Sequence, residues 1–264
     1  LAHEYDFCYA IIGFHPCNVK GLTCEDYEWL DNALNDEKVV ALGEIGYDFH
    51  WDTTTKEEQD DAFIKQLDLA VKHKIPIAIH SRDAAQVTFD VLSKYNNLLV
   101  GGVLHSYSGS VEMAREYTKR VFLLGISGPL TFKNAKVNKE VVKEIPLEYL
   151  VTETDSPYLT PHPYRGTENG PKYIPLILKE IASLKELDED EYNLDRFIYN
   201  SLFASDIIEE YEEVQNEKLS LEEENKLLKE KIKKSEKTIL ELSNKLKISL
   251  DDIEANRNKL KINN

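Results

Sequence analysis

The chain has 264 residues, of which 42% are hydrophobic, and this is enough for one sizeable core. Its net charge of −16 excludes a broad basic face for nucleic acid, because such binding needs Lys and Arg side chains to replace the counterions of the phosphates. Its three cysteines form no CxxC motif and no apolar run has the length of a membrane span, so we expect free thiols in the cytoplasm and no membrane partner.

Six short apolar runs, taken in chain order, predict the strands of a parallel sheet. Each run is nearly continuous rather than alternating in hydrophobicity, which is typical of strands that are buried on both faces. The runs are Cys8–Phe14, Val39–Gly43, Ile75–His80, Leu99–His105, Val121–Ile126 and Leu150–Glu153.

Helical spacing of the apolar residues between and after these runs predicts four helices. They cover Glu57–Lys72, Ala84–Tyr95, Val111–Lys119 and Tyr173–Lys185. Strands that alternate with helices indicate βα units. Six such units fit either an open, doubly wound sheet or most of an eight-stranded barrel, and periodicity alone does not choose between them.

The character of the sequence changes after about residue 205, where glycine and proline disappear and apolar residues recur every seven positions. One series is Ile232, Ile239, Leu246, Ile253 and Leu260, and a second contains Val214, Leu221, Leu228 and Leu242. This spacing is typical of a coiled coil. We therefore predict two domains, 1–205 and 206–264. The second is a long coiled-coil helix that pairs through 211–260 with another copy or another coiled-coil protein. One amphipathic helix packed on its own barrel is the alternative.

Metal-binding side chains stand at the ends of four predicted strands. Glu44 follows the second run, His80 and His105 end the third and fourth, and Asp155 follows the sixth. Active sites of parallel α/β folds are built at this edge. Each residue alone is explained more simply as part of a strand end or turn. Together, a glutamate, two imidazoles and an aspartate at one edge predict a site for Zn²⁺, Mn²⁺ or a similar divalent ion.

Seven linked motifs occur between residue 1 and about residue 203. They are GFHP (13–16), GEIGYD (43–48), IHSRDA (79–84), HSYSGS (105–110), TFKNAK (131–136), ETDSPYLTPHPYRG (153–166) and NSLF (200–203). In this order and spacing they resemble the TatD family of metal-dependent deoxyribonucleases, which belongs to the amidohydrolase-type metal barrels. The resemblance implies a (β/α)₈ TIM-type barrel that holds one or two divalent ions (Mg²⁺, Mn²⁺ or Zn²⁺) at its mouth. Its implied substrate is DNA, single-stranded or at 3′ ends.

The resemblance also implies roles for the residues at the strand ends. Glu44 is the carboxylate shared between two metals, and His80 and His105 hold one of them. Asp155 contacts the other metal or acts as general base toward the attacking water, so Asp155 and Glu44 are the expected catalytic residues.

Three further residues are candidates for substrate binding. Arg165 lies in the Tyr-Arg-Gly turn, where the resemblance implies a contact with a substrate phosphate. Arg82 is a second candidate for this contact, although an ion pair with Asp83 or Asp48 would explain the presence of this arginine equally well. His15 follows the first predicted strand. It either lines the site or only forms part of a turn, and the sequence favours neither.

The sequence departs from the family at its beginning. The family starts with a strand that ends in His-x-His, and no such motif occurs here. We therefore expect a barrel that lacks its first two strands, and we interpret the sequence as part of a longer protein rather than a degraded relative, because the other ligands are intact. A barrel open at two strands exposes sheet edges, so we expect weak or absent nuclease activity from this chain.

Two other functions compete with DNA cleavage. The same metal ligands serve an amidohydrolase that acts on a small C–N substrate, and a closed small-molecule pocket would favour that reading. A catalytically impaired scaffold that associates through the coiled coil is the other. Basic and aromatic residues expected around the rim favour the nuclease.

Overall fold

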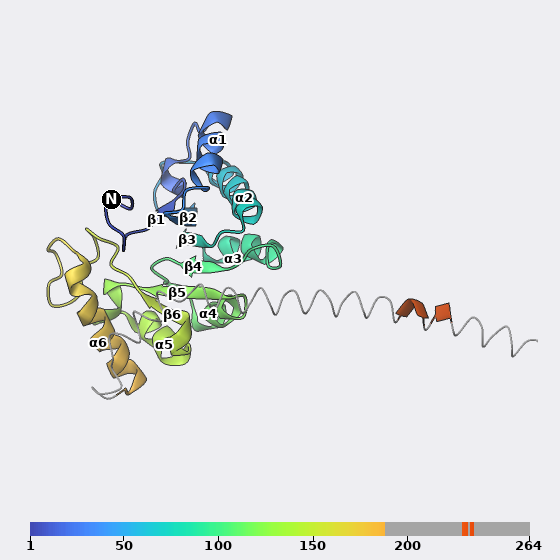
Figure 1. Ribbon diagram of the computed structural model, residues 1–264. Coiled ribbons are helices and arrows are strands. Elements are labelled where there is room, and N and C mark those ends of the chain that lie inside the picture. The colour runs from blue at the N-terminus through green and yellow to red at the C-terminus, as the bar shows by residue number, and fades with distance from the viewer. Residues whose placement is uncertain (188–228, 232, 235–264) are drawn as a thin grey trace, which may run out of the picture. The chain divides into compact units, whose positions relative to one another are not determined.

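The computed structural model describes residues 1–187, 229–231 and 233–234 (Figure 1). The chain divides into two compact units, Leu1–Tyr211 and Glu212–Asn264. The five described residues of the second unit are helical, and the rest of the predicted coiled coil, together with the predicted domain limit at 205, lies outside the described residues. No helix within the described residues is long and apolar enough to cross a membrane.

Within residues 1–187, the described part of the first unit, six parallel strands form one sheet whose order follows the sequence. The strands are β1 (Ala10–Ile12), β2 (Val39–Asp48), β3 (Ile77–Arg82), β4 (Gly102–Leu104), β5 (Phe122–Ile126) and β6 (Leu150–Thr152). A doubly wound sheet reverses its strand order at a switch point, whereas a barrel adds strands in sequence. The consecutive order therefore decides between the two architectures and confirms the barrel-type α/β fold.

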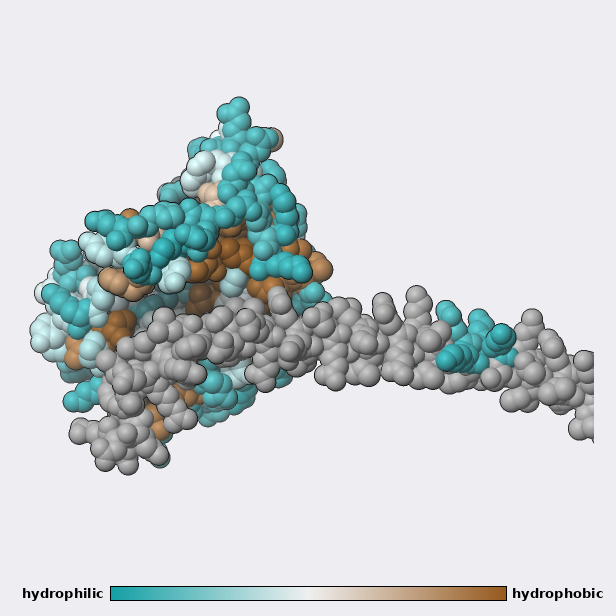
Figure 2. Space-filling view, in the orientation of Figure 1, coloured by the Kyte–Doolittle hydropathy of each residue, from teal (hydrophilic) through white to brown (hydrophobic). Residues whose placement is uncertain are grey.

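Helices connect the strands and follow one another along the outer side of the sheet (Figure 1). They are α1 (Cys24–Ala33), α2 (Lys56–His73), α3 (Ala85–Lys94), α4 (Val111–Thr118), α5 (Lys136–Glu144) and α6 (Ile174–Lys185). Short 3₁₀ turns cover Pro16–Asn18, Gly128–Thr131, Leu147–Tyr149 and Pro171–Tyr173. The hydrophobic core lies between helices and strands, while hydrophilic residues cover much of the outer surface (Figure 2).

Two details of the predicted elements were wrong. Helices α1 and α5 were not predicted, because each buries few apolar residues and so shows little periodicity. The second strand does not end at Gly43 but continues to Asp48, and its pairing with β3 shifts register between Gly43 and Ile45. Glu44 therefore lies inside β2, at a bulge, and bulges of this kind re-aim side chains next to active sites.

Helix α2 ties the ends of β1 and β2 together through two buried glutamines. Gln59 and Gln66 are seven residues apart, so they lie on the same face of the helix. The Gln66 amide accepts a hydrogen bond from the Phe14 N–H at 2.7 Å and donates to the Phe14 carbonyl at 3.1 Å. Gln59 makes the same pair of bonds with the backbone of Asp48, at 2.9 and 2.8 Å. One helix face thus fixes the backbone on either side of the predicted site.

We expect Gln66→Met to destabilise the first unit by about 1–3 kcal/mol, because it leaves the partly buried N–H and carbonyl of Phe14 without their partner. The midpoint of urea denaturation, followed by circular dichroism, measures this loss. Gln86→Met is the matched control, since Gln86 is exposed and bonds only to Asp90 within its own helix. Equal midpoints for the two variants would contradict the clamping role of Gln66.

Candidate metal centre

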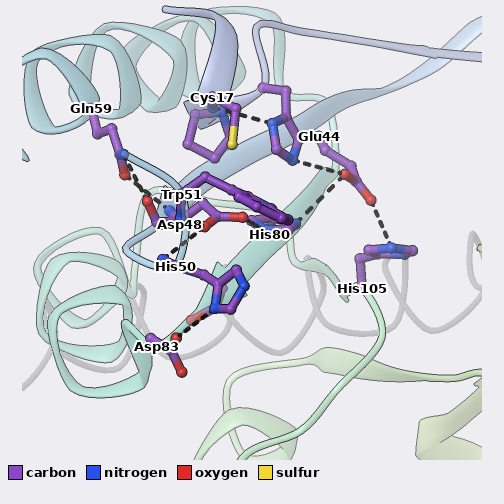
Figure 3. A network of polar contacts seen from close by, with 12 residues as sticks. Cys17, Glu44, Asp48, His50, Trp51, Gln59, His80, Asp83 and His105 are labelled. Atoms are coloured by element: carbon purple, nitrogen blue, oxygen red, sulfur yellow. Dashed lines mark hydrogen bonds and ion pairs between the residues drawn. The ribbon is translucent and has the colours of Figure 1, made fainter. Parts of the chain in front are cut away.

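The carboxylate of Glu44 is the point on which the predicted ligands converge. Its Oε1 lies 2.9 Å from Nε2 of His105. Its Oε2 lies 3.7 Å from Nδ1 of His80 and 3.6 Å from Nε2 of His15. The contacts place imidazoles on two sides of one carboxylate, as Figure 3 shows. This arrangement fits a carboxylate that is shared between two cation positions.

His80 is held by a carboxylate behind it. Its Nε2 lies 2.9 Å from Oδ2 of Asp48, which is only 1% exposed. In a neutral His80 this contact places the ring proton on Nε2, so that the Nδ1 lone pair faces Glu44. The Nδ1 atom is therefore the one available to a metal ion. The bulged position of Glu44 brings its carboxylate to the same side.

His105 has the same arrangement on the other side of Glu44. Its Nδ1 lies 2.8 Å from Oε2 of Glu153, and its Nε2 lies 3.1 Å from Oδ1 of Asp155. Burial lowers the pKa of the imidazole, but hydrogen bonds to three carboxylates outweigh burial and raise the pKa to about 12. The carboxylates that stabilise a proton here would equally stabilise a divalent cation in its place.

The two supporting carboxylates, Asp48 and Glu153, were not among the predicted site residues. Glu153 also accepts the Ser106 N–H, and it fits because a Cβ at Gly125 would lie 2.7 Å from its carboxyl carbon. A signal for Asp48 exists in the sequence, since residues four apart on a strand share a face and Asp48 follows Glu44 by four. Glu153 gives no such signal, because its role depends on the proximity of β6 to the loop after β4.

His15 lies in the same cluster, in the turn after β1. One ligand atom from each of His15, Glu44 and His80 can be chosen such that all lie within 4.8 Å of one another, close enough to hold a metal ion. However, Nδ1 of His15 accepts a hydrogen bond from the Cys17 N–H at 3.2 Å. The proton of the neutral ring then sits on Nε2 and points toward Glu44. This makes His15 a hydrogen-bond donor in the site rather than a metal ligand.

Burial and neighbouring charges shift the pKa values of His15 and Glu44 in the cluster. Burial lowers the pKa of His15, and the nearby His80 lowers it further, so the ring stays neutral. Burial raises the pKa of Glu44, but His105 and the other imidazoles outweigh it and hold the pKa below its usual value. Glu44 is therefore ionised, while the raised pKa of His105 means that a divalent cation would have to replace the proton of that ring. Carboxylate oxygens and imidazole nitrogens together are the donor set of Zn²⁺ and Mn²⁺ sites.

Six of the seven predicted site residues line one cavity of about 700 Å³. They are His15, Glu44, His80, Arg82, His105 and Asp155. The guanidinium of Arg82 lies over the Trp51 ring, 5.6 Å from its centroid. Within the described residues Asp83 pairs with His50 and Asp48 with His80, so neither forms the ion pair that competed with a substrate role for Arg82.

Arg165 is the predicted residue that does not line this cavity. Its guanidinium lies over the Phe132 ring, 4.3 Å from the centroid, and it lines a separate pocket of about 290 Å³. The other lining residues of that pocket are Phe132, Lys133, Asn134 and His162. The pocket is formed by the loops after β5 and β6, and the same two loops contribute Pro129 and Asp155 to the larger cavity.

Comparison with known proteins places this geometry in a family. Residues 1–195 match the family model described as TatD related DNase. The chain is 47% identical over 191 residues to the uncharacterized metal-dependent hydrolase YabD of Bacillus subtilis, covering 72% of this chain and 75% of that protein. It is 35% identical over 191 residues to the uncharacterized metal-dependent hydrolase YcfH of Escherichia coli, covering 72% and 71%.

Solved structures show the same likeness. The TatD homologue YJJV of Escherichia coli matches with a TM-score of 0.71 and 30% identity, over 76% of this chain and 78% of that one. A TatD family hydrolase from Entamoeba histolytica matches with a TM-score of 0.61 over 74% and 73%, and at 24% identity it supports the fold alone.

We expect Asp48→Asn to weaken Mn²⁺ binding about 10- to 100-fold, the usual cost of losing a partner behind a ligating histidine. If the NH₂ group of the asparagine faces His80, the Nε2–H of His80 loses its acceptor. If the NH₂ group faces the other way, the N–H groups of His50 and Trp51 lose theirs. Titration calorimetry measures the affinity. Asp52→Asn, at an exposed aspartate in the same loop, is the control. Unchanged affinity in Asp48→Asn would contradict its supporting role.

Proposed function

The chain belongs to the family of TatD-related, metal-dependent hydrolases, and we propose that the bond it cleaves is the phosphodiester bond of DNA. One observation carries the proposal: Glu44 lies between His80 on one side and His105 with Asp155 on the other, in a cavity that also contains Arg82. Two cation positions joined by a carboxylate, with a guanidinium beside them, match the negative charge that a phosphodiester brings into the site.

The residues present fit one or two divalent ions. Imidazole nitrogens and carboxylate oxygens suit Zn²⁺ and Mn²⁺, and the carboxylates alone suit Mg²⁺. Nδ1 of His80 and Nε2 of His105 would offer nitrogens to an ion, His105 after losing the proton that the carboxylates around it stabilise, while Glu44 and Asp155 would offer oxygens. A divalent ion bound there would lower the pKa of a coordinated water and offset the charge of the phosphate.

The protein's own groups then divide the work of hydrolysis. Asp155 lines the cavity and accepts the proton of the attacking water as general base. Arg82 binds a non-bridging phosphate oxygen, since a guanidinium suits this contact in charge and geometry. The Nε2–H of His15 donates to a second phosphate oxygen. His15 and Arg82 thus hold the phosphate, while Glu44 would hold the divalent ions.

Arg165 and Lys133 form a second, cationic site for the phosphate backbone. Within the described residues no carboxylate pairs with Arg165, and the Phe132 ring fixes the plane of its guanidinium. The loops after β5 and β6, which form this pocket, also contribute Asp155 to the metal cavity, so the second site would bind a phosphate further along the strand from the reacting one. A longer substrate therefore gains a contact that a small amide lacks.

The cleavage proposal predicts that Asp155→Asn and Glu44→Gln each slow Mn²⁺-dependent cutting of a labelled single-stranded oligonucleotide about 10²- to 10⁴-fold, the usual contribution of a positioned acid or base. Single-turnover conditions with protein in excess make weak activity measurable. Asp52→Asn is the control, because that aspartate is exposed and lies outside the cavity.

Three results of this experiment would change the conclusion. Cutting by Asp155→Asn at the wild-type rate would exclude Asp155 as the base. A wild-type chain that binds Mn²⁺ and hydrolyses small amides but no DNA would replace the nuclease with an amidohydrolase. A chain that binds metal and hydrolyses neither substrate would favour a scaffold.

We expect Arg165→Ala to raise KM for a single-stranded oligonucleotide about 10- to 150-fold, which is the loss of one hydrogen bond to a charged group. We expect kcat to change little, because Arg165 lies outside the metal cavity. Arg115→Ala is the matched control, since Arg115 is exposed and pairs with Glu144 on the outer helices. An equal KM for Arg165→Ala and wild type would remove the second phosphate site.

A further inference from the structure

Two large aromatic rings line the metal cavity and remain exposed. Trp51 is 54% exposed and Tyr158 is 71% exposed, and both line the same cavity as Glu44. Rings of this size usually contribute to stability by burial. Single exposed hydrophobic side chains are nevertheless ordinary on protein surfaces, so exposure by itself assigns no role to either ring.

The backbone contacts of the two rings are more specific. The N–H of Trp51 donates to Oδ1 of Asp48 at 3.2 Å, and the N–H of Tyr158 donates to the carbonyl of Asp155 at 2.8 Å. Each ring therefore stands three residues after an acid of the metal cluster and is fixed to that acid by a turn. The other oxygen of Asp48 holds His80, so the position of Trp51 is tied directly to that of a ligand.

The rings come from opposite sides of the cluster. Trp51 follows β2 and Tyr158 follows β6, and three strands separate these two in the sheet. Arg82 lies against the Trp51 ring, which puts a phosphate-binding group and an aromatic face side by side. Figure 3 shows Trp51 beside Asp48 and His80. A chain of alternating phosphates and flat rings matches this alternation of charge and aromatic surface.

We propose that Trp51 and Tyr158 are stacking platforms for two bases of a single-stranded nucleic acid, on either side of the phosphate at the metal centre. This inference rests on the proposed function and names its substrate class. Bases of a single strand offer free π-faces to aromatic side chains, whereas bases in a duplex are already stacked on each other. Duplex DNA therefore cannot use the two platforms unless its end opens.

The first test compares two strands that differ only in their bases. One is a single-stranded oligonucleotide, and the other is an abasic strand of the same length that keeps every phosphate. We expect Trp51→Ala and Tyr158→Ala each to raise KM for the base-bearing strand about 5- to 150-fold, the usual loss per stacked base. We expect KM for the abasic strand to change much less, with any loss in Trp51→Ala coming from the contact of its ring with Arg82. We expect Trp51→Phe and Tyr158→Phe to restore binding.

The chain offers a matched control for removing an exposed ring. Tyr9 is 58% exposed and carries Lys38 over its ring at 4.7 Å, much as Trp51 carries Arg82, but it does not line the cavity. Tyr9→Ala should leave KM for both strands unchanged. Equal KM in Trp51→Ala, Tyr158→Ala and wild type would overturn the proposal, and so would a loss of equal size on the abasic strand.

A binding measurement separates this proposal from the cleavage reaction. The chain has two tryptophans, Trp29 and Trp51, so Trp29→Phe leaves Trp51 as the single fluorescent tryptophan. We expect the base-bearing strand, with Mg²⁺ present, to quench this fluorescence, and the abasic strand not to. If the wild-type chain cuts no DNA, the proposed function fails, but selective quenching still supports stacking on Trp51. Absence of quenching by the base-bearing strand overturns the stacking proposal whether or not the chain cuts DNA.

Discussion

The site depends on one partly buried carboxylate that must stay ionised. Burial raises the pKa of Glu44, and the imidazoles around it lower the pKa by more. An isolated buried charge would cost several kcal/mol, so Glu44 needs positive or dipolar partners from other strands. The consecutive order of the parallel strands supplies them, because His15, His80 and His105 follow or end neighbouring strands at one edge. The ionised state of Glu44 therefore depends on the order of the strands in the sheet.

Helix α2 holds the backbone beside these site residues in place. Its two buried glutamines bond the backbone at Phe14 and at Asp48, next to His15 and behind His80. The side chain of Asp48 serves two further purposes: one oxygen orients His80, and the other holds the loop that carries Trp51. A shift of α2 along its axis would therefore move the donor His15, the ligand His80 and the loop of Trp51 together. This coupling explains why two glutamines occupy the otherwise apolar inner face of the helix.

Much of this arrangement could be predicted from the sequence, and the features that could not be predicted have identifiable physical reasons. Apolar runs located all six strands, and residues at their ends predicted Glu44, His80, His105 and Asp155, which the structure brings together. The bulge that places Glu44 inside β2 leaves no periodic signal. Glu153 acquires its role only through a contact between β6 and the loop after β4. Arg165 faces another pocket because the turns of a proline-rich loop, rather than any period, set its direction.

The acidic composition constrains how such a site can recognise a polyanion. With a net charge of −16, the molecule as a whole repels a nucleic acid, and Arg82 is the one arginine or lysine among the residues that line the described metal cavity. Under the proposed function, attraction is therefore local and of two kinds: divalent ions that Glu44 would hold, and aromatic faces whose stacking does not depend on charge. Such recognition favours a strand whose bases are already free. The shortage of basic side chains in the cavity and the exposure of Trp51 and Tyr158 both agree with the proposed mode of binding.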